Sequence, residues 1–107
     1  MTDRTTIVVS IGRDLGPTPI PAPQWETFIE HVTFVVSSLN GNVVGRARGR
    51  GEWDGGSEDN YVLIALFPTA LLPVLRSQLR VAAGNFGQEA IGLVVHNDGD
   101  NSLVEAS

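Results

Sequence analysis

Two segments of the chain carry hydrophobic side chains at three- and four-residue spacing, which is the pattern of an amphipathic helix. The first spans residues 23–40, and its apolar stripe consists of Trp25, Phe28, Ile29, Val32, Val35, Val36 and Leu39. The second follows Pro68, and its stripe consists of Leu71, Leu72, Leu75, Leu79 and Ala82. Thr69 is the expected N-cap of this second helix, because a threonine hydroxyl can accept a hydrogen bond from the first free N–H groups. Pro73 falls in the first turn, so the helix could instead start one or two residues later. Asn40-Gly41 is expected to end the first helix with a residue that tolerates positive φ.

Four other segments have the composition of β-strands. Residues 5–13 and 90–96 are rich in β-branched side chains. Residues 61–67 are apolar on both faces, which predicts a central strand covered on both sides. Residues 42–53 alternate small residues with charged ones, and this pattern is typical of an exposed edge strand.

The order of these elements is strand, helix, strand, strand, helix, strand, which is the split βαβ pattern of the ferredoxin-like sandwich. Right-handed crossovers then give an antiparallel four-stranded sheet in the order 4-1-3-2, with both helices on one face. We therefore expect an α+β fold, with a single domain over residues 1–96 and a polar C-terminal tail over residues 97–107, in which Leu103-Val104 could dock on the domain.

The sheet face opposite the helices is expected to be apolar. It would carry Val8, together with either Tyr61, Leu63, Ala65 and Phe67 or the alternating set Val62, Ile64 and Leu66. Such a face exposes more apolar surface than monomers usually tolerate. The pattern therefore predicts a homodimer that packs sheet on sheet, unless the tail or the proline-rich segment 14–23 covers the face.

Composition narrows the classes of function. The 107 residues have a net charge of −5 and no cysteine, so disulfides, thiolate catalysis and cysteine-based zinc sites are excluded. An acidic chain also disfavours nucleic acid and anionic membranes. No apolar run is long enough to span a membrane and no export signal is evident, so we expect a cytoplasmic protein. All seven basic residues are arginine, which suggests a GC-rich genome such as that of an actinobacterium or one of its phages.

Arg46, Arg48 and Arg50 form a stripe on one face of the predicted edge strand. Arginine forks match phosphate oxygens, so the stripe could bind RNA, a nucleotide or a phosphate-bearing ligand on an open sheet. Alternatively, the stripe guards an exposed edge and pairs with the nearby acids Glu52, Asp54, Glu58 and Asp59.

Glu89 and His96 are the other residues expected to contact a ligand or partner. With Arg48 they are also the best candidates for an active site, if the chain is an enzyme. His31 and His96 lack the spacing of a metal site, and no nucleophile motif or dinucleotide fingerprint is present. We therefore expect no metal and no cofactor.

Three short patterns occur in order along the chain: Trp25-x-x-Phe28, Gly49-x-Gly51-x-Trp53 and Phe86-Gly87-Gln88-Glu89. Together they resemble a family of small uncharacterised bacterial proteins whose domain has no assigned function. The resemblance covers residues 6–95. It implies the ferredoxin-like fold and supplies no activity or site residues.

Three functions remain open. The first is a non-enzymatic binding module for a protein or small ligand, which the lack of a catalytic constellation favours. The second is a small dimeric α+β-barrel enzyme acting on a small molecule. The third is a nucleotide or RNA binder that uses the arginine stripe.

Overall fold

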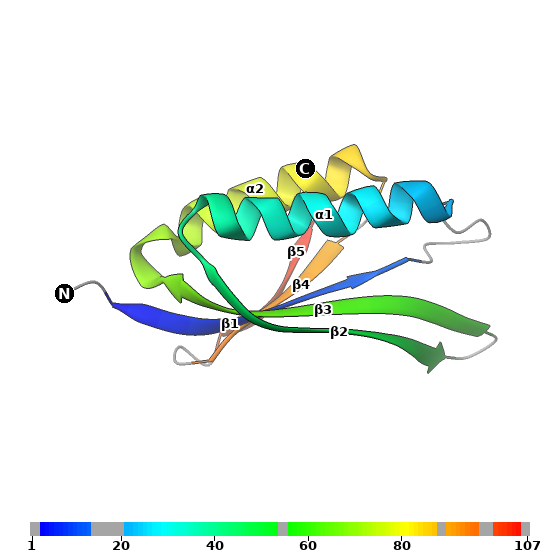
Figure 1. The fold of residues 1–107 in the computed structure, drawn as a ribbon, viewed down its shortest axis with the longest axis horizontal. Coiled ribbons are helices and arrows are strands. Elements are labelled where there is room, and N and C mark those ends of the chain that lie inside the picture. Colours follow the sequence, from blue (N-terminus) through cyan, green and yellow to red (C-terminus); the bar gives the residue numbers. More distant parts are fainter. Residues whose placement is uncertain (1–2, 14–20, 54–55, 88–89, 97–99, 106–107) are drawn as a thin grey trace.

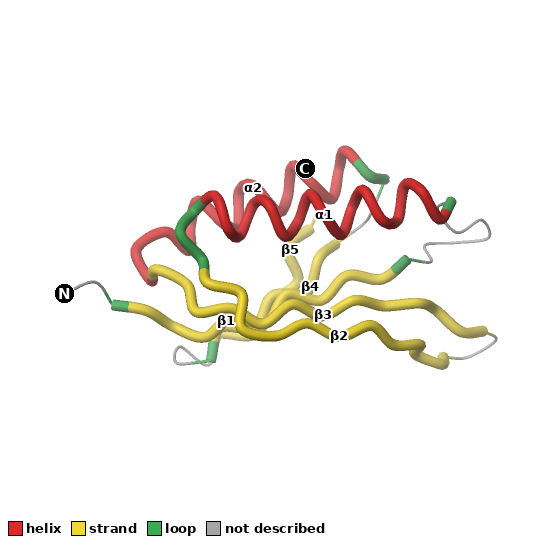
Figure 2. Tube along the Cα trace, in the orientation of Figure 1, coloured by secondary structure: helices red, strands yellow, loops and turns green. Residues whose placement is uncertain are grey.

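Two helices lie over one face of a five-stranded sheet (Figures 1 and 2). The computed structural model describes residues 3–13, 21–53, 56–87, 90–96 and 100–105. The elements are β1 (Arg4–Gly12), α1 (Ala22–Ser38), β2 (Asn42–Trp53), β3 (Gly56–Pro68), the 3-10 turn η1 (Thr69–Leu71), α2 (Leu72–Asn85), β4 (Ala90–Val95) and β5 (Asp100–Glu105).

The sheet is antiparallel throughout, in the order β2-β3-β1-β4-β5. The first four strands have the predicted ferredoxin-like order, and the α+β prediction is confirmed. The expected polar tail is corrected, because residues 100–105 add a fifth strand. Its backbone pairs with β4 from Ala90 opposite Glu105 to Val95 opposite Asp100. A strand edge can recruit even a polar segment, since the pairing uses backbone groups.

The core lies between the sheet and the helices. Alternate residues of β1, β3 and β4 point toward the helices and are buried, as the two-residue period of a strand requires. They are Ile7, Val9, Ile11, Tyr61, Leu63, Ala65, Phe67, Ile91, Leu93 and Val95. The predicted helical stripes meet them, and all but Leu39 and Leu71 are buried. No helix in the described parts of the chain has the length and hydropathy needed to cross a membrane.

The second helix starts later than a cap at Thr69 would place it, as the position of Pro73 indicated. Thr69 makes no side-chain cap and belongs to η1, and the α-helix begins at Leu72. Pro73 explains the shift: a proline fits an α-helix only in its first turn, where its missing N–H would have no partner.

The register of β2 decides where the arginines point. Arg46 lies opposite Leu63, and Arg48 lies opposite Tyr61. Directly opposed residues of an antiparallel pair project from the same face of a sheet. The side chains of Arg46 and Arg48 therefore project from the helix side of the sheet. A bulge between Val43 and Gly45 shifts the register near the start of the strand.

The other face of the sheet has no helix over it. Val8 of β1 lies opposite both Ile64 of β3 and Val94 of β4. The two last side chains are 36% and 40% exposed, and Leu66 is 38% exposed. Of the two sets considered for this face, the one containing Val62, Ile64 and Leu66 is the correct one. We call Val8, Val62, Ile64, Leu66 and Val94 the open-face patch.

Candidate functional site

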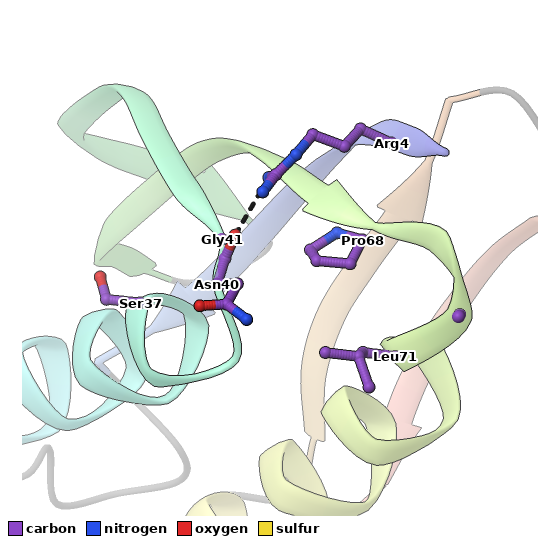
Figure 3. Close-up of a pocket in the computed structure, with 7 residues that line it drawn as sticks. Arg4, Ser37, Asn40, Gly41, Pro68 and Leu71 are labelled. Atoms are coloured by element: carbon purple, nitrogen blue, oxygen red, sulfur yellow. Dashed lines mark hydrogen bonds between the residues drawn. The ribbon is translucent and has the colours of Figure 1, made fainter. Parts of the chain in front are cut away.

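The largest hollow that we describe lies where α1 ends and β3 turns into α2 (Figure 3). We call it the corner cavity. Its volume is about 510 Å³, within the range of pockets that hold small molecules. Its lining residues are Arg4, Ser37, Asn40, Gly41, Pro68, Ala70 and Leu71.

The helix end that forms one wall is built by Asn40 and Gly41. Asn40 has a φ of 68°, as predicted for the residue after the helix. Its N–H donates to the carbonyl of Ser37, and the N–H of Gly41 donates to the carbonyl of Val36. These two bonds form a Schellman motif, which satisfies carbonyls that the helix leaves free.

Gly41 is required by close packing. A Cβ atom at this position would lie 2.6 Å from both Cγ1 and the carbonyl oxygen of Val36. It would also lie 3.0 Å from Cδ1 of Phe67. Only glycine allows the chain to leave α1 so close to the core, and this close approach fixes the polar wall of the cavity.

Arg4 reaches across the corner cavity (Figure 3). Its Nη1 donates to the carbonyl of Asn40 at 3.0 Å and to the carbonyl of Leu66 at 3.2 Å. A cation is favoured at this place, since the carboxyl end of a helix carries partial negative charge. Figure 3 shows Pro68 and Leu71 on one side and Ser37 and Asn40 on the other. The cavity thus combines an apolar wall, a polar wall and a fixed guanidinium.

A second, smaller hollow of about 120 Å³ is lined by Arg46 and Arg48, two of the three arginines of the predicted stripe. Its lining residues are Ile29, Arg46, Ala47, Arg48 and Tyr61, and we call it the arginine groove. Arg48 donates two hydrogen bonds to the carboxylate of Glu26 on α1, at 2.6 and 2.9 Å. Its guanidinium carbon lies 5.9 Å from the centre of the Tyr61 ring.

The ion pair in the arginine groove affects both partners. The hydrogen bond from Arg48 holds the pKa of the Glu26 carboxyl below its ordinary value, and the charges of Arg48 and Arg13 act in the same direction. The hydrogen bond to Glu26 likewise raises the pKa of Arg48. The acids near β2 in sequence were expected to pair with this arginine, and that expectation is wrong for Arg48. Arg48 projects from the helix side, so a carboxylate of α1 is within its reach. Asp59 instead pairs with Arg13 at 3.1 Å.

Tyr61 contributes a buried polar atom to this region. The residue is 2% exposed, and its hydroxyl has no hydrogen-bond partner in the parts of the chain we describe. The hydroxyl of Thr5, in β1, is in the same condition. Unpartnered buried hydroxyls are rare because water would have bonded to them in the unfolded chain.

The third hollow, of about 260 Å³, lies between the two helices. Its lining residues are His31, Phe34, Val35, Ser77, Gln78, Val81 and Asn85. The ring of His31 lies 5.9 Å from that of Phe86, which stacks on Phe28 at 4.9 Å. His31 therefore packs against aromatic rings.

Among the predicted site residues whose side chains the structure describes, Arg46 and Arg48 lie together in the arginine groove. The backbone of Arg50 pairs with Asp59, and its side chain is outside the description. Glu89 lies outside the described residues. His96 follows β4, and its N–H donates to the carbonyl of Thr6. Two strands separate β4 from β2, so His96 and the arginines do not share a site.

Sequence reasoning missed Arg4 and Glu26 as site residues. Arg4 stands next to a predicted strand with no pattern around it, and its role depends on a carbonyl 36 residues away. The signal available for the corner cavity was Asn40-Gly41, which was recognised as a helix end and not as a wall of a site.

No known protein family matches the chain, and no curated protein sequence matches it. Solved structures do match. A phage SAM lyase in complex with S-methyl-5'-thioadenosine superposes with a TM-score of 0.58 and 15% identity, covering 96% of this chain and 90% of the lyase. A phage SAM lyase in the apo state superposes with a TM-score of 0.55 and 12% identity, again covering 96% of this chain and 90% of the lyase. An unknown protein from Galdieria sulphuraria gives 0.54 and 16% identity, covering 94% of this chain and 50% of that protein.

These similarities show a shared fold. At such low identity they place no catalytic residue on this chain. Nearly all of the chain and nearly all of the phage enzyme are matched. The two proteins therefore share the whole architecture, and the similarity is not limited to one motif.

Proposed function

We propose that this protein binds S-adenosylmethionine (SAM) and cleaves it as a lyase. The bond between the sulfonium and the amino-acid arm breaks, its electron pair stays on sulfur to give S-methyl-5'-thioadenosine, and the arm closes on its own carboxylate oxygen and leaves as a lactone. The observation that carries the proposal is the end-to-end similarity to a phage SAM lyase, over 96% of this chain and 90% of the enzyme. It develops the second of the three functions that the sequence left open, a small α+β enzyme acting on a small molecule. Two neighbours are phage proteins, which supports the phage among the two sources, actinobacterium or phage, that the composition suggested.

Features of this chain support a ligand of that kind. The corner cavity, at about 510 Å³, has room for a nucleoside thioether. SAM carries a sulfonium and an ammonium group, and a protein with a net charge of −5 attracts a cationic ligand.

The arginine groove supports the nucleotide or RNA alternative less well. Its volume of about 120 Å³ is too small for a nucleotide. Arg48 is already occupied by the carboxylate of Glu26, and an incoming phosphate would have to displace that carboxylate.

The test is direct turnover. Purified protein is incubated with SAM, and S-methyl-5'-thioadenosine is measured by liquid chromatography and mass spectrometry against a blank without protein. Calorimetric titration with each compound measures binding separately. We expect the thioether product to form faster than in the blank, and both compounds to bind. Absence of both binding and product formation would reject the proposal.

We also propose that two copies of the chain associate through the open-face patch, because the centre of this face is apolar and uncharged. The strand register places Gly45 and Ala47 of β2 beside Ile64 and Val62, and Gly92 of β4 beside Ser10. Small residues there leave room for a second sheet to approach. Burying exposed apolar surface gains ~25 cal/mol per Å² before association costs are subtracted.

Sedimentation velocity at several protein concentrations tests this association. We expect a dimer for the wild type and a monomer for Ile64→Asp, which places a charge in the patch. Val81→Asp is the matched control, because Val81 is exposed on α2, away from the patch. A wild type that stays monomeric at micromolar concentration, or equal behaviour of the two variants, would contradict the proposal.

A further inference from the structure

The guanidinium of Arg4 is held by two hydrogen bonds to the protein, and some of its N–H donors take no part in them. Both of its bonds to the protein come from Nη1, which donates to the carbonyls of Asn40 and Leu66. Arginine has five N–H donors in a planar fork. Those on Nη2 and Nε have no partner in the described part of the chain, so one edge of the fork is left for another acceptor.

Nη1 of Arg4 meets the partial negative charge at the end of α1, and the opposite edge of the guanidinium can still bind an anion. None of the described residues that line the corner cavity is acidic, and Arg4 forms no ion pair with a described carboxylate. The hydroxyl of Ser37 and the amide of Asn40 are further hydrogen-bond donors on the opposite wall. The chain as a whole has a net charge of −5, whereas the described residues lining this cavity include one arginine and no acid.

We propose that the corner cavity binds the amino-acid end of the nucleoside ligand, with the ligand's carboxylate on the free edge of Arg4. This inference rests on the proposed function, since that function supplies a ligand with such a carboxylate. The apolar wall of Pro68, Ala70 and Leu71 then contacts the nucleoside. A guanidinium matches a carboxylate with two parallel hydrogen bonds, and fixing Nη1 beforehand lowers the entropy lost on binding.

The test compares two ligands that differ only in the amino-acid arm. S-adenosylhomocysteine and S-methyl-5'-thioadenosine are both neutral thioethers of adenosine, and only the first has a carboxylate. Their dissociation constants are measured by calorimetry for the wild type and for Arg4→Met. Arg80→Met is the matched control, because Arg80 is an exposed arginine on α2 outside the cavity.

We expect Arg4→Met to raise the dissociation constant of S-adenosylhomocysteine by about tenfold to a hundredfold, the range for losing hydrogen bonds to a charged group. The dissociation constant of S-methyl-5'-thioadenosine should change by less than about twofold, within the scatter of such measurements. For S-adenosylhomocysteine, the affinity of Arg4→Lys should lie between those of the wild type and Arg4→Met. A lysine keeps the positive charge but lacks the planar guanidinium that donates two parallel hydrogen bonds. Arg80→Met should leave the dissociation constants of both ligands unchanged.

Arg4→Met also removes two hydrogen bonds of the fold, so its thermal unfolding is recorded alongside. Ala70→Trp provides a test that leaves those bonds intact: it fills the cavity and should weaken both ligands. If the wild type binds both ligands and Arg4→Met weakens both equally or neither, the placement on Arg4 is overturned while the proposed function stands. If Ala70→Trp leaves both affinities unchanged, the corner cavity is not the site. If the wild type binds neither ligand, the proposed function fails and this inference fails with it.

Discussion

Replacing Tyr61 by phenylalanine should stabilise this protein. The ring of Tyr61 is buried on the helix side of β3, and its hydroxyl has no hydrogen-bond partner among the described groups. Burying an unpaired hydroxyl costs ~1–3 kcal/mol in protein mutational data. Removing the oxygen recovers that cost and leaves a void of one atom, which takes back part of the gain.

The net expectation for Tyr61→Phe is a free energy of unfolding higher by about 1 kcal/mol. For a domain of this size, such a gain raises the melting temperature by roughly 4–8 °C. Urea denaturation followed by circular dichroism gives the free energy, and a calorimetric scan gives the melting temperature.

Two threonines provide the comparison. Thr5→Val should also stabilise, because the Thr5 hydroxyl is buried without a partner. Thr33→Val should not stabilise, because the Thr33 hydroxyl donates to the carbonyl of Ile29 at 2.8 Å. A loss of about 1 kcal/mol or more in Tyr61→Phe would refute the reasoning, since it would mean that the hydroxyl makes a hydrogen bond in solution.

Two further predictions concern the walls of the two sites. Gly41→Ala should lower the free energy of unfolding by about 2–3 kcal/mol, because the new Cβ would overlap the backbone of Val36. Gly45→Ala is its control in the same urea assay, with no atom closer than 3.9 Å to the new Cβ, and equal losses in the two variants would contradict the steric argument. Arg48→Met should raise the pKa of Glu26 toward its ordinary value, because the hydrogen bond that lowers it is removed. A carboxyl with a lowered folded-state pKa stabilises the protein above its unfolded-state pKa and loses that effect as pH falls through the folded-state value. Wild-type stability should therefore fall more steeply in acid than that of Arg48→Met, and an unchanged Glu26 midpoint in a carbon-13 NMR titration would count against the ion pair.

Much of the fold could be predicted from residue spacing. The stripe from Trp25 to Val36 fixed both the existence of α1 and the face that it buries. The small residues that alternate with arginines in residues 42–53 identified an edge strand. These predictions succeeded because each depends on neighbours a few residues apart, where the geometry of helix and strand is nearly constant.

The errors share a different cause. Residues 100–105 have no strand pattern of their own, and they become a strand because β4 offers a free edge. Thr69 was expected to cap α2, and it lies in η1 instead because the helix starts later, near Pro73. The partner of Arg48 was sought nearby in sequence, whereas Glu26 lies 22 residues away on another layer.

By itself, the sequence determined the two helices, the strands β1 to β4, their order and the helix faces that enter the core, because burial of apolar surface follows the period of each helix. Only the tertiary structure decided that Arg48 meets Glu26, that Arg4 crosses a cavity to the end of α1, and that a fifth strand completes the sheet. Those contacts join residues far apart in the chain. Their geometry depends on how whole elements pack, and no local pattern records it.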